Sequence, residues 1–185
     1  MSIRTVTGGG FHTCALLGTA MRCWGYNFHG QLGGYATASP RPVVVTALSG
    51  ATTVTAGTDF ACALVNTAVT DQPMCWGSNT DGRLGAGLGV LETTVRVPVA
   101  GITAADAIDA GNGHACALPD ASNTPQCWGL GVNGQLGDSG TASQSTPDPV
   151  SGLTNATSVN AGGALGTAER GMTCAVRTDG KVSCW

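Results

Sequence analysis

A pattern that recurs four times constrains the fold of this chain more than any other feature. Each copy has two small residues (Gly-Gly or Ala-Gly), then Cys-Ala, then Cys-Trp, and the first three copies continue to Gly-Gln/Arg-Leu-Gly. The copies begin at Gly8, Ala56, Ala110 and Ala161, and the fourth stops at Trp185. Self-similarity at a period of this size is typical of propellers and solenoids, in which each repeat forms one structural unit.

The motifs resemble the repeat of the regulator of chromosome condensation family, over nearly the whole chain. The resemblance depends on Cys-Trp-Gly at 23–25, 75–77 and 127–129, followed by Gly-Gln/Arg-Leu-Gly at 30–33, 82–85 and 134–137. It implies that each repeat makes a four-stranded blade and that seven blades close a ring. It implies less about function, because the family includes an exchange factor for the GTPase Ran, a plant ultraviolet photoreceptor and a secreted bacterial β-lactamase inhibitor.

We therefore predict an all-β fold, a β-propeller segment of four-stranded antiparallel blades in a single domain, residues 1–185. The blades would fall at approximately 1–47, 48–100, 101–152 and 153–185, the last incomplete. Three blades and most of a fourth cannot close a ring of the family's size, so we expect an open arc or, our preferred interpretation, a fragment of a longer protein. Bare blade faces at both ends would allow self-association.

The strands of the second repeat are predicted at residues 53–55, 62–64, 74–76 and 95–99. The fourth strands of the first and third repeats are predicted at 43–45 and around Val150. Prolines cluster there, which fits an edge strand because proline lacks the N–H that a neighbour would need. The expected core is Val6, Leu16, Trp24, Leu32, Val54, Leu64, Trp76, Leu84, Ile108, Leu118, Trp128, Leu136, Val159, Val176 and Val182.

The eight cysteines form four pairs, one pair in each repeat, and strand register decides whether they can face each other. A two-residue turn at 18–19 aligns the first pair, and a three-residue loop ending at Gly180 aligns the fourth. The tryptophan after each second cysteine would then oppose a small residue, as packed cross-strand pairs require. Reduced thiols are the alternative. The predicted disulfides are Cys14–Cys23, Cys62–Cys75, Cys116–Cys127 and Cys174–Cys184.

Disulfides persist in oxidising compartments, so we expect a bacterial protein that is secreted, periplasmic or at the cell surface. Residues 1–10 show no signal peptide, and no apolar run approaches the ~20 residues of a membrane span. Only 10% of the residues are charged, the net charge is −3, and the arginines are scattered beside a single lysine, Lys181. No nucleic-acid partner is therefore expected, because such a surface needs clustered basic residues.

A binding surface is predicted where loops vary between repeats on a constant scaffold. The loop from the first to the second strand and the loop from the third to the fourth lie on one ring face, together with an insertion at 163–171. An ordinary turn role is the simpler interpretation of any single loop residue, whereas binding is the better interpretation of the whole face. The predicted contact residues are Phe11, Tyr26, Phe28, His29, Asp59, Asp81 and Leu130.

No catalytic residue, metal ligand or cofactor is predicted. His12 and His114 occupy a position that Phe60 fills in the second repeat, so packing explains them better than chemistry. The cysteine spacing lacks the zinc knuckle, and Gly-Gln-Leu-Gly lacks the ending of a phosphate loop. We expect a non-catalytic module that binds a protein or another ligand. The alternatives are a guanine-nucleotide exchange factor for a small GTPase and the non-catalytic part of a larger secreted enzyme or surface protein.

Overall fold

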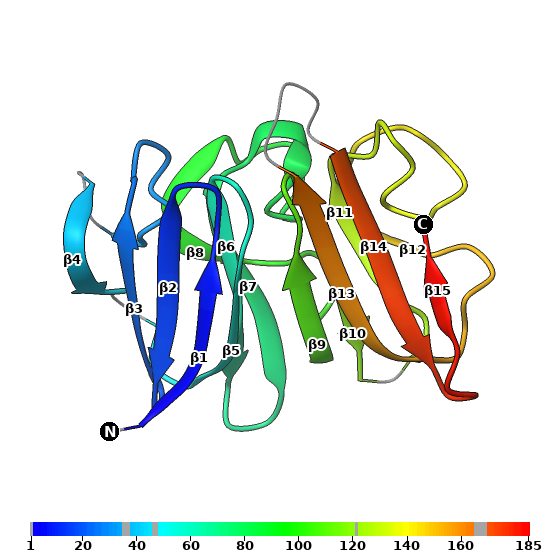
Figure 1. Ribbon diagram of the computed structural model, residues 1–185, viewed down its shortest axis with the longest axis horizontal. Coiled ribbons are helices and arrows are strands. Elements are labelled where there is room, and N and C mark those ends of the chain that lie inside the picture. The colour runs from blue at the N-terminus through cyan, green and yellow to red at the C-terminus, as the bar shows by residue number, and fades with distance from the viewer. Residues whose placement is uncertain (1, 35–37, 46–47, 121, 165–169) are drawn as a thin grey trace.

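The computed structural model describes residues 2–34, 38–45, 48–120, 122–164 and 170–185. These residues form four antiparallel sheets that stand side by side in an arc, with the two chain ends at opposite ends of it (Figure 1). The all-β propeller architecture predicted from the repeats is confirmed. Most of the predicted insertion at 163–171 lies outside the described residues.

Within every sheet the strands follow one another in chain order. The first sheet contains β1 (Ile3–Gly8), β2 (His12–Leu17), β3 (Ala20–Gly25) and β4 (Ser39–Val44). The second contains β5 (Ala51–Ala56), β6 (Phe60–Asn66), β7 (Asp71–Ser78) and β8 (Glu92–Pro98), with the short 3-10 helix η1 (Thr80–Gly82) before β8. The third contains β9 (Ala105–Ala110), β10 (His114–Pro119), β11 (Gln126–Gly129) and β12 (Gln144–Pro149). The fourth contains β13 (Ala156–Ala164), β14 (Arg170–Arg177) and β15 (Val182–Cys184).

The clustered prolines lie in the edge strands β4, β8 and β12, where the missing N–H leaves no neighbouring strand unsatisfied. The fourth strand predicted around Val150 is displaced, because β12 ends at Pro149. Val150 is instead buried between the third and fourth sheets, and its main-chain N–H donates to the carbonyl of Pro125 at 2.9 Å.

All four predicted disulfides are present, and they follow the predicted register. Each joins directly opposite residues of two neighbouring strands, with Cα atoms 4.1 Å apart. The aligning turns contain glycine with positive φ, +64° at Gly18 and +77° at Gly180, which a side chain would disfavour. As expected, Trp24 opposes Thr13 and Trp76 opposes Ala61.

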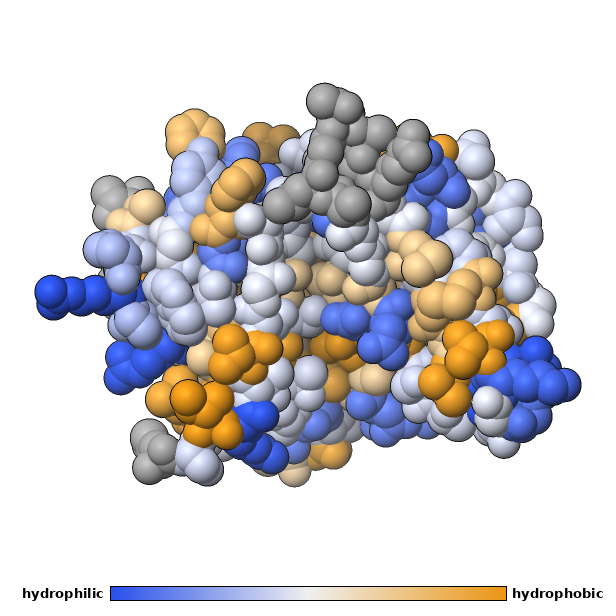
Figure 2. Space-filling view, in the orientation of Figure 1, coloured by the Kyte–Doolittle hydropathy of each residue, from blue (hydrophilic) through white to orange (hydrophobic). Residues whose placement is uncertain are grey.

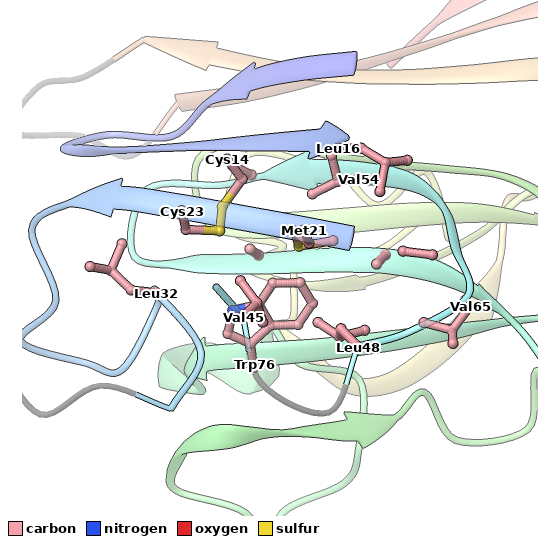
Figure 3. Close-up of a cluster of buried hydrophobic side chains, with 14 residues drawn as sticks. Cys14, Leu16, Met21, Cys23, Leu32, Val45, Leu48, Val54, Val65 and Trp76 are labelled. Carbon is pink, nitrogen blue, oxygen red and sulfur yellow. A yellow bond between two sulfur atoms is a disulfide. The ribbon is translucent and has the colours of Figure 1, made fainter. Parts of the chain in front are cut away.

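The hydrophobic clusters lie between sheets. In the first, the Cys14–Cys23 disulfide and Leu32 of the first sheet meet Trp76 of the second (Figure 3). The indole N–H of Trp76 donates to the carbonyl of Gln31 at 3.0 Å. Trp128 makes the same contact with the carbonyl of Arg83 in the preceding sheet, also at 3.0 Å. Each tryptophan therefore packs on the Gly-x-Leu-Gly loop of the preceding repeat, and each of the first three disulfides faces the following sheet.

Four residues of the predicted core are not buried. Val6 is 56% exposed and Val182 is 61% exposed, Val176 is also exposed, and Trp24 is half-buried. All four belong to the first or the last sheet, whose outer faces have no neighbouring sheet among the described residues. Figure 2 shows hydrophobic residues at the surface over the β1 and β14 ends of the arc. The core prediction was wrong here because it assumed a neighbour on both sides of every blade.

Candidate functional site

The loops that join the first to the second strand, and the third to the fourth, lie along one edge of the arc, uppermost in Figure 1. In the first sheet a hydrogen bond joins two of these loops, from the N–H of Tyr26 to the carbonyl of Phe11 at 2.8 Å. Gly25 permits this close approach. Its φ is +110°, and a Cβ added there would lie 2.5 Å from that carbonyl.

Four of the predicted contact residues form one row of rings on this edge. Phe11 meets Tyr26 edge-on with ring centroids 6.2 Å apart, and Tyr26 stacks on Phe28 at 6.3 Å. Phe28 in turn meets His29 edge-on at 5.2 Å. Phe11 is 66% exposed and Phe28 is 74% exposed, so the row presents aromatic surface to solvent. We call these four residues the aromatic row.

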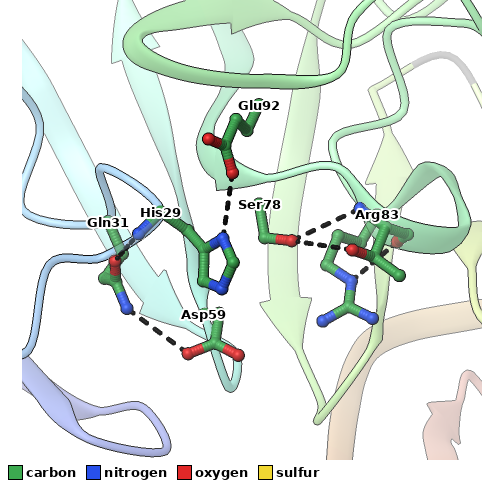
Figure 4. A network of polar contacts seen from close by, with 7 residues as sticks. His29, Gln31, Asp59, Ser78, Arg83 and Glu92 are labelled. Atoms are coloured by element: carbon green, nitrogen blue, oxygen red, sulfur yellow. Dashed lines mark hydrogen bonds and ion pairs between the residues drawn. The ribbon is translucent and has the colours of Figure 1, made fainter.

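The buried amide of Gln31 holds the end of the aromatic row in place. Its Oε1 accepts the main-chain N–H of His29 at 3.0 Å, and its Nε2 donates to Oδ1 of Asp59 in the second sheet at 3.3 Å. The imidazole of His29 completes the network, since its Nδ1 lies 2.9 Å from Oε2 of Glu92 (Figure 4). His29 and Asp59, both predicted contact residues, are therefore linked across two sheets.

A hollow of about 750 Å³ opens beside this network. Its wall comes from three sheets: His29 from the first, residues 78–82, 87–88 and 90–92 from the second, and residues 143–145 from the third. The amide of Asn79 shapes the loop below it, because its Oδ1 accepts the N–H of Leu84 at 2.9 Å. Asn27 does the same for Leu32 in the first repeat at 2.8 Å, so this turn belongs to the repeated scaffold.

Asp81 lines the hollow, as does the carboxylate of Glu92. The guanidinium of Arg83 bonds Oδ2 of Asp81 at 3.3 Å and the carbonyl of Thr80 at 2.7 Å. Arg83 itself is buried and does not line the hollow. The exposed side of the pair therefore presents the carboxylate.

Leu130, also a predicted contact residue, is only 7% exposed and therefore offers little side-chain surface to a partner. Its N–H donates to the carbonyl of Gly113, which holds this loop against the third sheet. Three residues that line the hollow, Leu88, Leu91 and Glu92, were not among the predicted contact residues. The apolar stretch at 88–91 could have indicated them. A loop that serves only as a turn is expected to contain polar residues, so leucines there point to another role.

Burial explains His12 and His114. Desolvation lowers the pKa of each from 6.5 to about 4, although a backbone hydrogen bond at Thr58 partly opposes this at His12. Nε2 of His114 lies 2.9 Å from the hydroxyl of Thr173, which donates to the carbonyl of Gln135. The ring is therefore a neutral donor that links the third and fourth sheets.

Two kinds of feature are absent from the described residues, a metal site and a membrane-spanning helix. No three His, Cys, Asp or Glu side chains come together among them in an arrangement that could hold a metal ion. The same part of the chain has no helix with the length and apolar character needed to cross a membrane.

Two segments match a model of the regulator of chromosome condensation (RCC1) repeat, at residues 3–31 and 127–168. The chain contains RCC1-type repeats. The matched segments include the Cys-Trp-Gly motifs of the first and third repeats, whose register and disulfides the structure shows.

Solved structures of larger proteins share the fold. Human WBSCR16 superposes on the whole chain with a TM-score of 0.80 at 17% identity, and the match covers 47% of that protein. Prp20p from Saccharomyces cerevisiae gives a TM-score of 0.79 at 21% identity over 99% of this chain and 43% of its own. The ectodomain of the receptor kinase CR4 from Physcomitrella patens gives 0.61 at 22% identity, over 99% of this chain and 41% of its own. The chain thus spans less than half the length of these proteins.

The RCC1 repeat explains the scaffold and leaves the aromatic row unexplained. Each repeat supplies a disulfide, and two of the tryptophans donate to the Gly-x-Leu-Gly loop of the preceding repeat. Tyr26 and Phe28, in contrast, correspond to Ser78 and Thr80 in the second repeat and to Leu130 and Val132 in the third. The row is therefore particular to one repeat.

Proposed function

We propose that the chain is a non-catalytic binding module and that a protein partner contacts the aromatic row and the adjoining hollow. The observation that carries the proposal is the position of the row, four rings in continuous contact on one exposed loop edge. Large aromatic side chains are enriched among the residues that contribute most to protein interfaces. A hollow beside them gives such an interface a place for a protruding side chain.

The scaffold supports this role because it fixes the loops before a partner arrives. The Cys14–Cys23 disulfide and the Gln31 amide hold both loops that present the row. A pre-organised surface loses little conformational entropy on binding, and a Phe or Tyr ring has only two side-chain dihedrals to fix.

The disulfides and the structural relatives both fit a protein partner in an oxidising compartment. Four disulfides persist outside the reducing cytosol, so we propose that the protein is secreted or displayed at a cell surface. One structural relative is a receptor-kinase ectodomain, and yeast RCC1 (Prp20) has been solved bound to Kap60. These relatives show that the fold is used both as an ectodomain and as a protein-binding scaffold.

Selection of displayed random peptides on the immobilised protein tests the proposal. We expect the enriched peptides to lose binding to Phe28→Ala and Phe11→Ala variants. They should still bind a Val69→Ala variant, because Val69 is an even more exposed apolar residue on the opposite edge, between β6 and β7. Enrichment that is insensitive to both phenylalanine variants would refute a binding role for this surface.

Guanine-nucleotide exchange remains the second candidate because the fold matches Prp20p, whose binding to Gsp1p has been described. The disulfides argue against it, since small GTPases work in reducing compartments. A nucleotide-release assay with a small GTPase separates the two. Acceleration of release by the chain would replace our proposal.

A further inference from the structure

We propose that the hollow beside the aromatic row receives a lysine or arginine side chain of the protein partner. The inference rests on the proposed function and adds the chemistry of the contact. The hollow has a volume of about 750 Å³, within the range of ~300–1,000 Å³ typical of ligand-binding pockets.

The polar side of the hollow is acidic. Asp81 and Glu92 both contribute carboxylates to its wall. In the described part of the chain neither lysine nor arginine lines it, because the nearby Arg83 is buried behind Asp81. Asp59 does not line the hollow, but its carboxylate belongs to the adjoining network through its bond to Gln31 (Figure 4). A partly desolvated site with excess negative charge favours a cation.

The apolar side of the hollow consists of two leucines on the loop that precedes β8. Leu88 is 89% exposed and Leu91 is 84% exposed, although both line the hollow. With Phe28 on the far side of His29, they extend the apolar surface of the aromatic row across the second sheet. Single exposed leucines are ordinary, whereas two beside a hollow and next to exposed rings mark an interaction surface.

Acidic and apolar walls together fit one kind of occupant. Lysine and arginine have long apolar stems that pack along hydrophobic surface while the charged head reaches a polar partner. The stem would lie against Leu88 and Leu91, and the head would meet the carboxylates of Asp81 and Glu92. Arginine could bond one of these carboxylates in a bidentate manner, and lysine would act as a point charge.

The His29–Glu92 pair lines both this hollow and a second one of about 320 Å³, which Phe28 also lines. Glu92 can therefore keep its bond to His29 while its other oxygen remains available, since its side chain is 56% exposed. The same holds for Asp81, which uses Oδ2 toward Arg83. Each carboxylate has a free oxygen for a cation without breaking the network.

The peptides selected in the previous experiment provide the first test. We expect lysine or arginine at one fixed position, flanked by apolar residues. A synthetic peptide with that lysine should bind about tenfold more tightly than its twin with norleucine, which keeps the stem and removes one charge-assisted contact. The difference should shrink at high salt, since the contact is partly exposed.

Matched variants locate the contact. Glu92→Gln and Asp81→Asn keep an acceptor for His29 and Arg83 and remove the charge, so each should reduce the preference for the lysine peptide about threefold. Asp120→Asn makes the same change on the opposite edge and should leave the preference unaltered. Unchanged melting curves would show that the variants fold.

The outcomes separate the two proposals. Peptides that need Phe28 but bind equally well with lysine or norleucine would overturn the cation site and leave the binding surface intact. A preference for lysine that survives both carboxylate variants would also overturn it. Absence of any peptide that depends on the aromatic row would overturn the proposed function, and the cation site with it.

Discussion

The interfaces inside the arc and the faces at its two ends contain the same motif in different surroundings. Trp76 is fully buried and donates its N–H to the preceding sheet, whereas Trp24 is half-buried on the outer face of the first sheet. Cys62 and Cys75 are fully buried, whereas Cys184 is exposed. Burial of a repeat residue is therefore a property of the neighbouring sheet, and a blade alone has no enclosed core.

The largest expected effect on stability is the difference between alanine substitutions of Trp76 and Trp24. Trp76→Ala should lower the free energy of unfolding by about 3–5 kcal/mol, because it opens a cavity and leaves the carbonyl of Gln31 without its donor. Trp24→Ala should cost only about 1 kcal/mol, since its side chain is only partly buried. Urea denaturation of both variants measures the difference, and equal losses would contradict the comparison.

A smaller loss of stability is expected when an aromatic side chain replaces a small residue opposite a tryptophan. Ala61 is fully buried opposite Trp76, so Ala61→Trp should cost about 1–3 kcal/mol through overpacking. Phe28→Ala trims an exposed ring and should stay within about 0.5 kcal/mol. Thr13→Trp, opposite the half-buried Trp24, should fall between them. The same denaturation experiment ranks the three, and an equal cost for all would disprove the blade register as the cause.

The buried histidine inside the arc should make stability depend on pH. His114 has a pKa of about 4 when folded and 6.5 when free, so only the unfolded chain takes up a proton between these values. The free energy of unfolding should therefore fall as pH drops from 6.5 to 4 and level off at either side. His114→Phe, which introduces the residue that the second repeat has at Phe60, should weaken this dependence, and His12, whose pKa is lowered to the same value, should supply the remainder. A slope unchanged by the substitution would assign the effect to other groups.

The end faces should associate weakly. Val6 on the first sheet and Val182 on the last are exposed apolar residues on unpaired faces. Light scattering should show a mass that rises with concentration, and Val6→Lys together with Val182→Lys should suppress the rise. A constant mass of one chain for the unsubstituted protein would count against association.

The smallest effect on stability is expected from mild reduction. The Cys174–Cys184 disulfide is accessible at its Cys184 side, whereas the other three are covered by the following sheet. A low concentration of reductant followed by alkylation should label Cys184 first, with little change in the melting curve. Labelling of Cys62 or Cys75 at the same rate would show that neighbouring sheets do not protect the internal disulfides.

Local register could be predicted from the sequence because the determinants are close in the chain. The spacing of Cys14 and Cys23 around a glycine turn fixes their pairing without reference to any other repeat. Leu130 and Val150 could not be placed this way, since their burial depends on neighbouring segments. Asp109 gave no sequence signal either. Its carboxylate accepts from Thr55 at 2.6 Å and from the N–H of Ala161 at 2.9 Å, and so joins three sheets.

The same distinction between local and long-range determinants applies to the candidate site. Phe11, Tyr26 and Phe28 were predicted from loop variability and from the enrichment of aromatic residues in interfaces, and the structure brings them together. The hollow was not predicted, because its wall is assembled from three sheets and no single loop contains it. Residues 88–91 become informative only when the loop is seen beside His29.

The contact between Trp76 and the Gly-x-Leu-Gly loop of the preceding repeat has a consequence for how such chains change length in evolution. Every internal joint consists of a loop from one repeat and an indole from the next, and each complete repeat encodes both halves. Duplication or loss of one whole repeat therefore regenerates an intact joint at the splice, wherever the recombination boundary falls within the unit. Gene rearrangement can therefore lengthen or shorten the array by whole repeats. The aromatic row is encoded within a single repeat, so its four residues are inherited or lost together.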